Sequence, residues 1–305
     1  MSGTVRVTPE LLQSMPLPQP DKDTDKNSRG TVLVVGGSVT SPGGAVLSGL
    51  AALRAGAGKA TLAVPRPIAI DLAVAFPEAG VHPLPSERDG TPRPALAARE
   101  VLRLMGKADV CLLGPGLADE PTAQELVRRV LPVADEKLFV IDALALTGLW
   151  NESELLERHR SRLVITPHPG EMASLSGRSM EDVCADPEAA ARQAAQHLGC
   201  IVVLKGATTV IASPDAPLYV HDGDCVGLAT SGSGDVLAGL LAALVARGCS
   251  PRVASLWAVW LHAQAGQALS KRVGPMGFLA RELLDEIPRA EANLDARDAR
   301  RKRAV

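Results

Sequence analysis

The sequence predicts an α/β protein with a doubly wound, mostly parallel sheet and helices on both of its faces. Short apolar runs of four or five residues alternate along the chain with segments of helical periodicity. These runs are apolar almost throughout and end at Gly or Pro, a pattern typical of parallel strands buried on both faces. Because the strands alternate with helices, we expect a single sheet with helices packed on each side.

The predicted elements follow one another from residue 31 to residue 244. Six strands are expected, at 31–35, 60–64, 109–113, 138–141, 162–165 and 200–204. The first strand ends at Gly36-Gly37 and precedes a predicted helix of small residues at 45–55. Two later runs, 208–212 and 218–220, predict a hairpin and therefore an antiparallel edge to the sheet. In open sheets of this kind ligands bind beyond the carboxyl ends of the strands.

The two ends of the chain differ from its middle. Residues 1–29 are rich in Pro, Asp and Lys and predict a lead-in with one short helix. Residues 289–305 interleave basic and acidic side chains, which is typical of a solvated segment, so we predict a charged and disordered C-terminal tail. Residues 30–288 are expected to form a single catalytic domain.

Composition excludes several classes of function. The chain has 32 Lys plus Arg and 34 Asp plus Glu, and only three Trp, three Phe and one Tyr. Without a basic excess or aromatic platforms, we expect no nucleic-acid partner. We also find no signal pattern or long apolar run, so no membrane partner is expected. The five cysteines are widely spread without a C-x-x-C pair, which favours free thiols in a reducing cytoplasm.

Two glycine-rich segments resemble phosphate-binding motifs but lack their spacing. The segment 56–61 looks like the end of a P-loop, yet Leu53 and Ala60 stand where that motif needs Gly and Ser or Thr. The turn Gly36-Gly37-Ser38 lacks the G-x-G-x-x-G spacing of a dinucleotide site. Both motifs are rejected, although a ligand could still approach the backbone of residues 37–45 closely.

The segment T-S-G-S-G-D at 230–235 carries the strongest functional signal. Leucines at helical spacing follow it, so its glycines lie at a helix N-terminus, where free amides and the helix dipole favour an anion. We predict an anion hole formed by Gly232, Ser233 and Gly234. Asp235 is the candidate catalytic base, because a carboxylate beside a bound phosphate can take the proton of an attacking hydroxyl. The structural alternative is that Asp235 only caps the helix.

Two further loops supply candidate ligand contacts. His168 stands between two prolines at the end of a strand, in T-P-H-P-G-E, and is predicted to contact substrate. The spacing of His168 and Glu171 is not that of a zinc protease. Lys205 lies in a turn between two strands, in K-G-A-T-T, where it could hold nucleotide phosphates or be a surface lysine on a plain hairpin.

The other five histidines are predicted to have structural rather than functional roles. His262 lies in an apolar helix and is expected to be a buried histidine with its hydrogen bonds satisfied. We expect surface or loop positions for the other four, His82, His159, His197 and His221.

Taken in order, these segments resemble those of the NAD(P)H-hydrate dehydratases, a family of the ribokinase-like superfamily. The resemblance extends from about residue 30 to residue 287, and T-P-H-P-G-E together with G-S-G-D-V-L-A-G is more specific than either string alone. The matching segments are 35–38, 44–45, 54–58, 114–117, 141–143, 166–171, 204–209 and 232–239. The resemblance implies a ribokinase-like fold.

The resemblance also implies a reaction. The family repairs hydrated NADH and NADPH (NADHX and NADPHX) by phosphorylating the 6-hydroxyl with ADP, in the bacterial type, or ATP, and then eliminating phosphate. This chain is thus expected to be an ADP-dependent (S)-NAD(P)H-hydrate dehydratase, a hydro-lyase that yields NAD(P)H, AMP and phosphate. Mg²⁺ bridging the nucleotide phosphates is the implied cofactor, and the residues that would bind a metal are left unassigned. A homo-oligomer, with a tetramer as one form, is also expected.

Site residues follow from the same resemblance, position by position. The hydrate would be contacted by Ala45, Gly116, His168 and Asp235. The nucleotide would be held by Lys205, Gly206, Ala207, Thr208, Thr209 and Gly234. Two positions depart from the family pattern: Ser231 replaces a usual Gly, which leaves the anion hole intact, and Leu144 replaces a usual acid, which removes a polar role from its loop.

Other functions compete with this one. A hydroxyethylthiazole-kinase type of small-molecule kinase would share the G-S-G-D helix start but not T-P-H-P-G-E with K-G-A-T-T. A nucleotide-sensing module would keep the glycines and lack the base at Asp235. Only 30 residues precede the first predicted strand. We therefore expect the dehydratase alone, with a separate NAD(P)HX epimerase acting in the same pathway.

Overall fold

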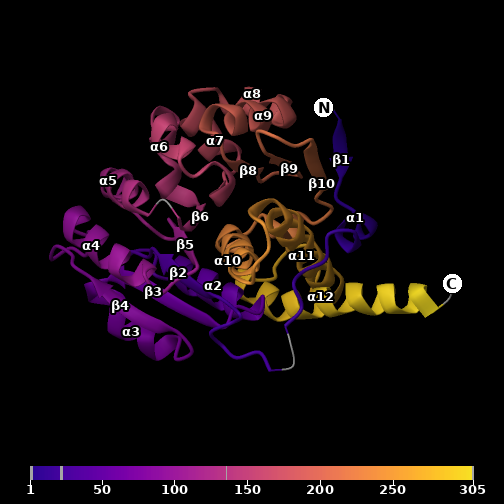
Figure 1. Cartoon of the computed structure of the whole chain (residues 1–305), viewed down its shortest axis with the longest axis horizontal. Coiled ribbons are helices and arrows are strands. Elements are labelled where there is room, and N and C mark those ends of the chain that lie inside the picture. Colours follow the sequence, from indigo (N-terminus) through magenta and orange to yellow (C-terminus); the bar gives the residue numbers. More distant parts are fainter. Residues whose placement is uncertain (1–2, 21–22, 135, 304–305) are drawn as a thin grey trace.

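The computed structural model describes residues 3–20, 23–134 and 136–303, and its centre is one ten-stranded sheet (Figure 1). The strand order is β1-β10-β9-β8-β7-β6-β5-β2-β3-β4. The strands are β1 (Thr4–Arg6), β2 (Thr31–Val35), β3 (Lys59–Pro65), β4 (Gly80–Leu84), β5 (Val110–Leu113), β6 (Leu138–Ile141), β7 (Leu163–Ile165), β8 (Ile201–Leu204), β9 (Thr208–Ala212) and β10 (Leu218–Asp222).

Helices connect most of these strands. They are α1 (Pro9–Gln13), α2 (Gly43–Arg54), α3 (Ala69–Ala75), α4 (Pro94–Met105), α5 (Glu120–Val130), α6 (Ser153–Glu157), α7 (Pro169–Ser176), α8 (Met180–Ala185), α9 (Pro187–Leu198), α10 (Ser233–Ala246), α11 (Pro251–Arg272) and α12 (Ala280–Arg303). Short 3₁₀ turns include η3 (Ala143–Leu146) and η6 (Val226–Leu228).

The connections confirm the doubly wound, mostly parallel sheet. From β2 the chain passes to β3 and β4 on one side, and then to β5, β6, β7 and β8 on the other. The strand order therefore reverses between β2 and β5, the place where ligands bind in such sheets. β9 pairs antiparallel with both β8 and β10, which confirms the predicted hairpin and antiparallel edge.

Both faces of the sheet are covered, as the unbroken apolar runs predict. Along β2, Val32 and Val34 belong to one core, and Leu33 and Val35 belong to the other. The first core packs α2, α3, α10, α11 and α12 against the sheet, and the second packs α4, α5, α7 and α9 (Figure 1). Each strand residue thus reaches one of two layers because successive side chains point to opposite faces.

Close packing of α2 against α10 positions the site. A Cβ on Gly239 would lie 2.1 Å from the carbonyl oxygen of Ser48, so only glycine allows this approach. The Ser48 Oγ also donates to the carbonyl oxygen of Asp235 at 3.0 Å. The two helices therefore begin side by side at the edge where β2 and β5 end.

The N-terminal segment is more ordered than a loose lead-in. The short helix is present as α1, but β1 adds a strand to the sheet, parallel to β10, which the sequence analysis missed. β4 was also missed, since Gly80 and Pro83 weaken its strand pattern. His159 was expected at a surface or loop position: it lies in a turn, but its side chain is buried, and its Nε2 lies 3.0 Å from the carbonyl oxygen of Leu131.

The predicted disordered tail from residue 289 is likewise corrected. α12 runs through residue 288 without a break and continues to Arg303. Ala290 and Leu294 are buried in the first core. The remaining residues favour a helix because they are rich in Ala and Arg, whose helix propensities are high. Charged side chains from residue 289 on therefore do not prevent this segment from forming a helix.

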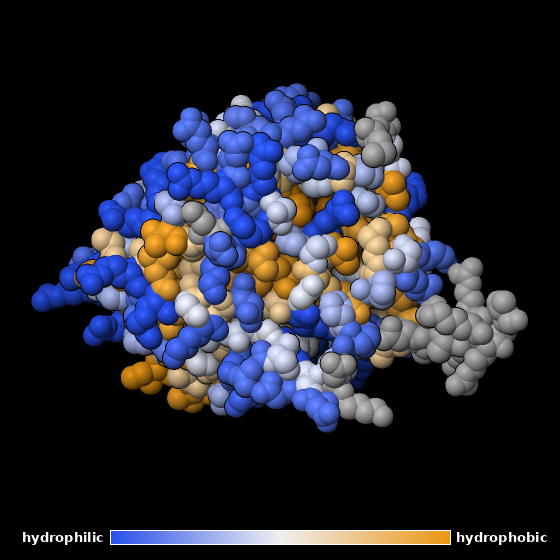
Figure 2. Space-filling model, viewed as in Figure 1, coloured by the Kyte–Doolittle hydropathy of each residue, from blue (hydrophilic) through white to orange (hydrophobic). Residues whose placement is uncertain are grey.

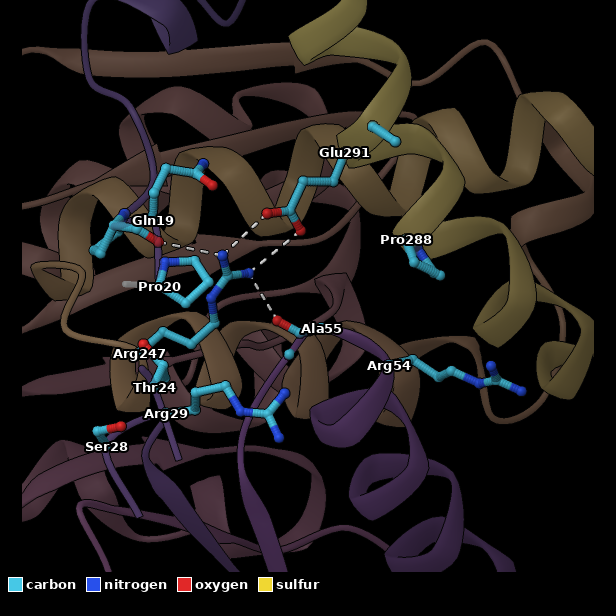
Figure 3. A pocket seen from close by; sticks show the side chains of 13 residues that line it. Gln19, Pro20, Thr24, Ser28, Arg29, Arg54, Ala55, Arg247, Pro288 and Glu291 are labelled. Carbon is cyan, nitrogen blue, oxygen red and sulfur yellow. Dashed lines mark hydrogen bonds and ion pairs between the residues drawn. The ribbon is translucent and has the colours of Figure 1, made fainter. Parts of the chain in front are cut away.

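Arg247 joins this helix to the rest of the molecule (Figure 3). Its guanidinium donates to the carbonyl oxygen of Ala55 at 2.8 Å and forms an ion pair with Glu291 at 3.0 Å. It lies at the ends of α2 and α10, where a positive charge is stabilised by the helix dipoles. The surrounding cavity of about 500 Å³ is bounded by the N-terminal segment, α2 and α12. We assign this cluster a structural role.

Polar side chains cover most of the face seen in Figure 2, with apolar side chains exposed in smaller groups between them. Ile70 and Val74 of α3 are among the exposed large apolar residues. Within the described residues, no helix is long and apolar enough to cross a membrane.

Candidate active site

The loops that follow β2 and β5 meet the start of α10. A Cβ on Gly44 would lie 2.9 Å from the Gly116 nitrogen and 3.2 Å from the Asp235 Oδ1. The Gly37 nitrogen donates to the carbonyl oxygen of Pro115 at 2.7 Å, which fixes the two glycine loops together. The structure therefore brings the predicted substrate-contact positions Gly116 and Asp235 together at the start of α2, the helix that carries Ala45.

At the N-terminus of α10 the Ser233 amide donates to the carbonyl oxygen of Thr230 at 3.2 Å. Gly232 occupies the N-cap with φ of +87°, and within the described part of the chain no side chain caps the helix. Asp235 lies in the first turn and does not serve as the N-cap residue. This geometry argues against the alternative that Asp235 is only a cap. The amides of Gly232 and Gly234 and the Asp235 carboxylate instead lie at one end of the helix, as an anion site with an adjacent base requires.

Lys205 points into this site and is not a surface lysine. Its Nζ lies 2.9 Å from the Asp142 Oδ1 and 3.8 Å from the Glu171 Oε2, and its side chain is 17% exposed. A Cβ on Gly234 would lie 3.2 Å from the same Nζ. The ammonium therefore lies at the N-terminus of α10, and the alternative of a surface lysine on a plain hairpin is wrong.

The sequence assigned no role in the site to Asp142 or Glu171, although Asp142 was recognised at a strand end, where it could line the cleft or belong to a simple turn. Asp142 follows β6 and is 3% exposed; its Oδ1 accepts hydrogen bonds from the Thr166 Oγ1 at 2.7 Å and from the Lys205 Nζ. A usable signal was present, because an acid directly after a continuous apolar strand lies at the carboxyl edge of the sheet. Glu171 was read only as part of the T-P-H-P-G-E string.

His168 is the N-cap of α7, and its hydrogen bonds define which nitrogen carries the proton. The Nδ1 accepts from the amides of Gly170 at 3.0 Å and Glu171 at 3.2 Å. In return, the Glu171 Oε2 accepts from the His168 amide at 2.7 Å. The neutral ring therefore carries its hydrogen on Nε2. The Nε2 lies 3.5 Å from the Glu171 Oε1, and because the His168 side chain is 55% exposed a ligand can also reach this N–H.

Burial and charge shift the pKa values of the site. Burial, reinforced by Asp142 and opposed by Lys205, raises the pKa of Asp235 to about 6. Burial also raises the pKa of Glu171, although Lys205 acts in the opposite direction. Burial works against the charged form of Lys205, but Asp142 and Glu171 outweigh it and raise its pKa. A carboxylate whose pKa is near 6 is a competent general base at neutral pH.

A cavity of about 590 Å³ opens beside Lys205. Its polar end contains Lys205 and the start of α10, and its other end is apolar, formed by residues that include Leu228, Val259 and Ala263. Of the predicted nucleotide contacts, five line the cavity: Lys205, Gly206, Ala207, Thr209 and Gly234. Thr208 does not; its hydroxyl lies 3.3 Å from the Asp222 Oδ1.

His262 lies behind the anion hole. Its Nε2 is 3.0 Å from the Ser233 Oγ and 3.1 Å from the Ser233 carbonyl oxygen. Burial lowers its pKa to about 4, so the ring is neutral near pH 7. The expectation of a buried, satisfied histidine is confirmed. His221, by contrast, is half-buried and lines the cavity.

The donor set does not suit a resident metal ion. Among the described residues, no group of three or more His, Cys, Asp or Glu side chains is arranged to hold one. The Asp142 carboxylate is also engaged by Lys205 and Thr166.

Fold and site together define a class of protein: a doubly wound α/β enzyme equipped to move a phosphoryl group between a nucleotide and a hydroxyl. The sequence profile of the family described as NAD(P)H-hydrate dehydratase matches residues 32–289. The chain is 44% identical over 283 residues to the ADP-dependent (S)-NAD(P)H-hydrate dehydratase of Xanthomonas campestris, covering 92% of this chain and 94% of that protein. The chain belongs to the NAD(P)H-hydrate dehydratase family.

Solved structures agree with this assignment. The structure is similar to that of the ADP/ATP-dependent NAD(P)H-hydrate dehydratase of Bacillus subtilis co-crystallised with ATP and Mg²⁺, with a TM-score of 0.79, 28% identity and coverage of 95% of this chain and 98% of that one. A hydroxyethylthiazole kinase of Pyrococcus horikoshii shares the fold, with a TM-score of 0.59 and 18% identity over 93% of this chain and 94% of that one. The ribokinase-like fold is confirmed, and the kinase alternative has the weaker support.

Proposed function

We propose that the chain is an ADP-dependent (S)-NAD(P)H-hydrate dehydratase that restores NADH and NADPH from their hydrates. One observation carries the mechanism: the Asp235 carboxylate lies between the N-terminus of α10 and the Gly44–Gly116 junction. The nucleotide would occupy the cavity on the Lys205 side, and the hydrate would lie on the Gly116 side. A hydroxyl placed between them is within reach of both the base and the phosphoryl group.

The reaction divides between these groups. The oxygen of the 6-hydroxyl attacks the terminal phosphorus of ADP while Asp235 takes the hydroxyl proton. AMP is the leaving group. Lys205 and the amides of Gly232 and Gly234 stabilise the charge on the moving phosphoryl group. The C6–O bond of the phosphate ester then breaks with loss of a neighbouring ring proton, which releases phosphate and restores the dihydronicotinamide. His168 would donate its Nε2–H to the hydrate.

Other components of the proposal rest on the chemistry of the site. Mg²⁺ would be bound through the nucleotide phosphates, where it neutralises part of their charge. The five cysteines are free thiols, which supports a reducing cytoplasm as the location. We further propose a homo-oligomer and a separate epimerase that supplies the reactive epimer of the hydrate.

The direct experiment incubates the purified chain with hydrated NADH and Mg²⁺ and follows the recovery of NADH absorbance. We expect recovery only when a nucleotide is added, and faster recovery with ADP than with ATP. Equal or faster turnover with ATP would contradict the ADP assignment. Recovery without any nucleotide would contradict phosphorylation itself.

Lys205→Met tests the nucleotide side of the site. The substitution removes the charge and keeps most of the side-chain length, so we expect the apparent KM for ADP to rise roughly ten- to 150-fold, as for loss of a charge-assisted contact of about 1.5–3 kcal/mol. The KM for hydrate should change much less. Steady-state kinetics with each substrate varied in turn measures both, and an unchanged KM for ADP would remove Lys205 from the nucleotide site.

The pH dependence tests Asp235 without a mutation. Because its pKa is raised to about 6, the carboxylate becomes protonated as the pH falls through that value and then cannot accept a proton. We expect kcat/KM for hydrate to be level near pH 7 and to fall about tenfold per pH unit well below pH 6. A profile that stays level down to pH 4.5, about the region of an ordinary carboxyl group, would show that the base is another group.

A further inference from the structure

Lys205 forms a buried ion pair with Asp142. The Asp142 carboxylate accepts hydrogen bonds from the Lys205 Nζ at 2.9 Å and the Thr166 Oγ1 at 2.7 Å. Both charged groups are largely removed from water. A buried ion pair of this kind is rarely retained for stability alone, since apolar replacement of both partners is often neutral. We therefore look for a role of the Asp142–Lys205 pair in the site.

The backbone around Asp142 is strained and tightly packed. Among the described residues, Ala143 is the only one other than glycine with a positive φ, at 53°. On the neighbouring strand end, Gly114 has φ of +127°, and a Cβ there would lie 1.8 Å from the Asp142 carbonyl oxygen. Strain of this kind persists only where the surroundings enforce it, and it concentrates at functional sites. The turn after β6 is thus built to hold Asp142 in one position.

We propose that Asp142 is a positioning residue of the reaction: acting through Lys205, it holds the ammonium at the N-terminus of α10, where the phosphoryl group moves. Lys205 has four rotatable side-chain bonds, and Asp142 fixes its end 3.2 Å from where a Cβ on Gly234 would lie. This inference rests on the function proposed above, because it gives Asp142 a place in that site.

The same pair sets the charge around the base. The charged groups that face Asp235 are Asp142 after β6, Glu171 of α7 and Lys205 after β8. Asp142 raises the pKa of Asp235, whereas Lys205 lowers it. Asp142→Asn keeps an oxygen that can accept from Lys205 and Thr166 but removes the negative charge. Asp235 should then lose its proton at lower pH.

The test is a double-mutant cycle of wild type, Asp142→Asn, Lys205→Met and the double variant, read by the apparent KM for ADP. We expect Asp142→Asn to raise this KM in the wild-type background. In the Lys205→Met background the same change should alter KM by less than about twofold, the range in which independent effects cannot be resolved. If Asp142→Asn multiplies KM by the same factor in both backgrounds, or leaves it unchanged in both, the proposal is overturned.

The second measurement is the acid limb of the pH profile, the fall of kcat/KM for hydrate at low pH. A purely structural role of Asp142 would leave the pH of this fall unchanged. We expect the limb to shift to lower pH in Asp142→Asn by roughly one unit or less. Glu157→Gln is the matched control, because it removes the same charge from an exposed pair with Arg160 and should leave the limb in place. A limb that stays fixed in Asp142→Asn, or shifts equally in the control, contradicts the proposal.

Failure of this inference can be separated from failure of the proposed function. ADP binding by calorimetry and thermal unfolding need no hydrate. If the wild type recovers no NADH, the proposed function is rejected. The coupling between Asp142 and Lys205 is then tested by ADP calorimetry and thermal unfolding alone. We expect the double variant to unfold at a higher temperature than Asp142→Asn alone, since it leaves no unpaired buried charge. A double variant whose two unfolding shifts simply add would show that the residues act independently.

Discussion

Asp235→Asn is expected to lower kcat by about 10²- to 10⁴-fold, the usual contribution of a positioned general base. The amide keeps the size of the side chain but cannot accept the hydroxyl proton. ADP affinity should change little, because the amides of α10 and Lys205 hold the phosphates. Steady-state kinetics and ADP calorimetry on the same preparation measure the two effects separately.

Stability distinguishes this result from simple unfolding. In the folded protein the pKa of Asp235 is raised from 3.8 to about 6, so the fold favours the protonated carboxyl. The ionised group therefore lowers the stability of the folded state at pH 7, and this effect disappears as the pH falls below about 4. Asp235→Asn should keep or raise Tm at pH 7. A near-normal kcat in Asp235→Asn would exclude Asp235 as the base. A lower Tm together with lost activity would show that its role is structural.

Asp71→Asn is the matched control for this variant. Asp71 also lies in the first turn of a helix, α3, but it is exposed and distant in the chain from the site loops. The same change there should leave both kcat and Tm close to the wild-type values.

Gly239→Ala is expected to cause the largest loss of stability. Its Cβ would lie 2.1 Å from the carbonyl oxygen of Ser48, and backbone cannot move aside as a flexible side chain does. Overpacking commonly costs about 1–3 kcal/mol, and we expect the upper part of that range or more, with a lower Tm. Because Ser48 also contacts Asp235, the surviving folded protein should have reduced kcat.

Gly43→Ala provides the comparison for Gly239→Ala in α2. A Cβ on Gly43 meets no described atom within 4 Å, so replacing this helical glycine should keep or slightly raise stability. Denaturant unfolding of both variants measures the difference. If Gly239→Ala is as stable as Gly43→Ala, the close approach of α2 and α10 is not required.

Local patterns predicted most of this fold because eight of the ten strands carried their own sequence signal. The run 138–141 is β6 without any shift, and the glycines before Val236 begin α10 where helical spacing starts. β4 and β1 were missed because a Pro-containing edge strand and a three-residue strand have too few residues for a pattern. The end of the chain was misread because charge alone does not separate a helix from a disordered segment.

The site was predicted less completely, because its contacts join residues far apart in the chain. Asp235, His168 and Lys205 stood out in their own loops. Asp142 was recognised only as a residue at a strand end, since its role depends on Lys205, which lies 63 positions later in the sequence. Similarly, the partner of His262 is Ser233, which only the packing of α11 on α10 reveals.

The measurement that tests the account most directly is the product balance of the complete reaction. The chain is supplied with hydrated NADH, ADP and Mg²⁺, and NADH, AMP and phosphate are quantified over the same time course. Transfer of the phosphoryl group to the 6-hydroxyl, followed by its elimination, predicts that one AMP and one phosphate form for each NADH recovered, and that Asp235→Asn slows all three together. NADH that accumulates while ADP is not consumed would contradict the account.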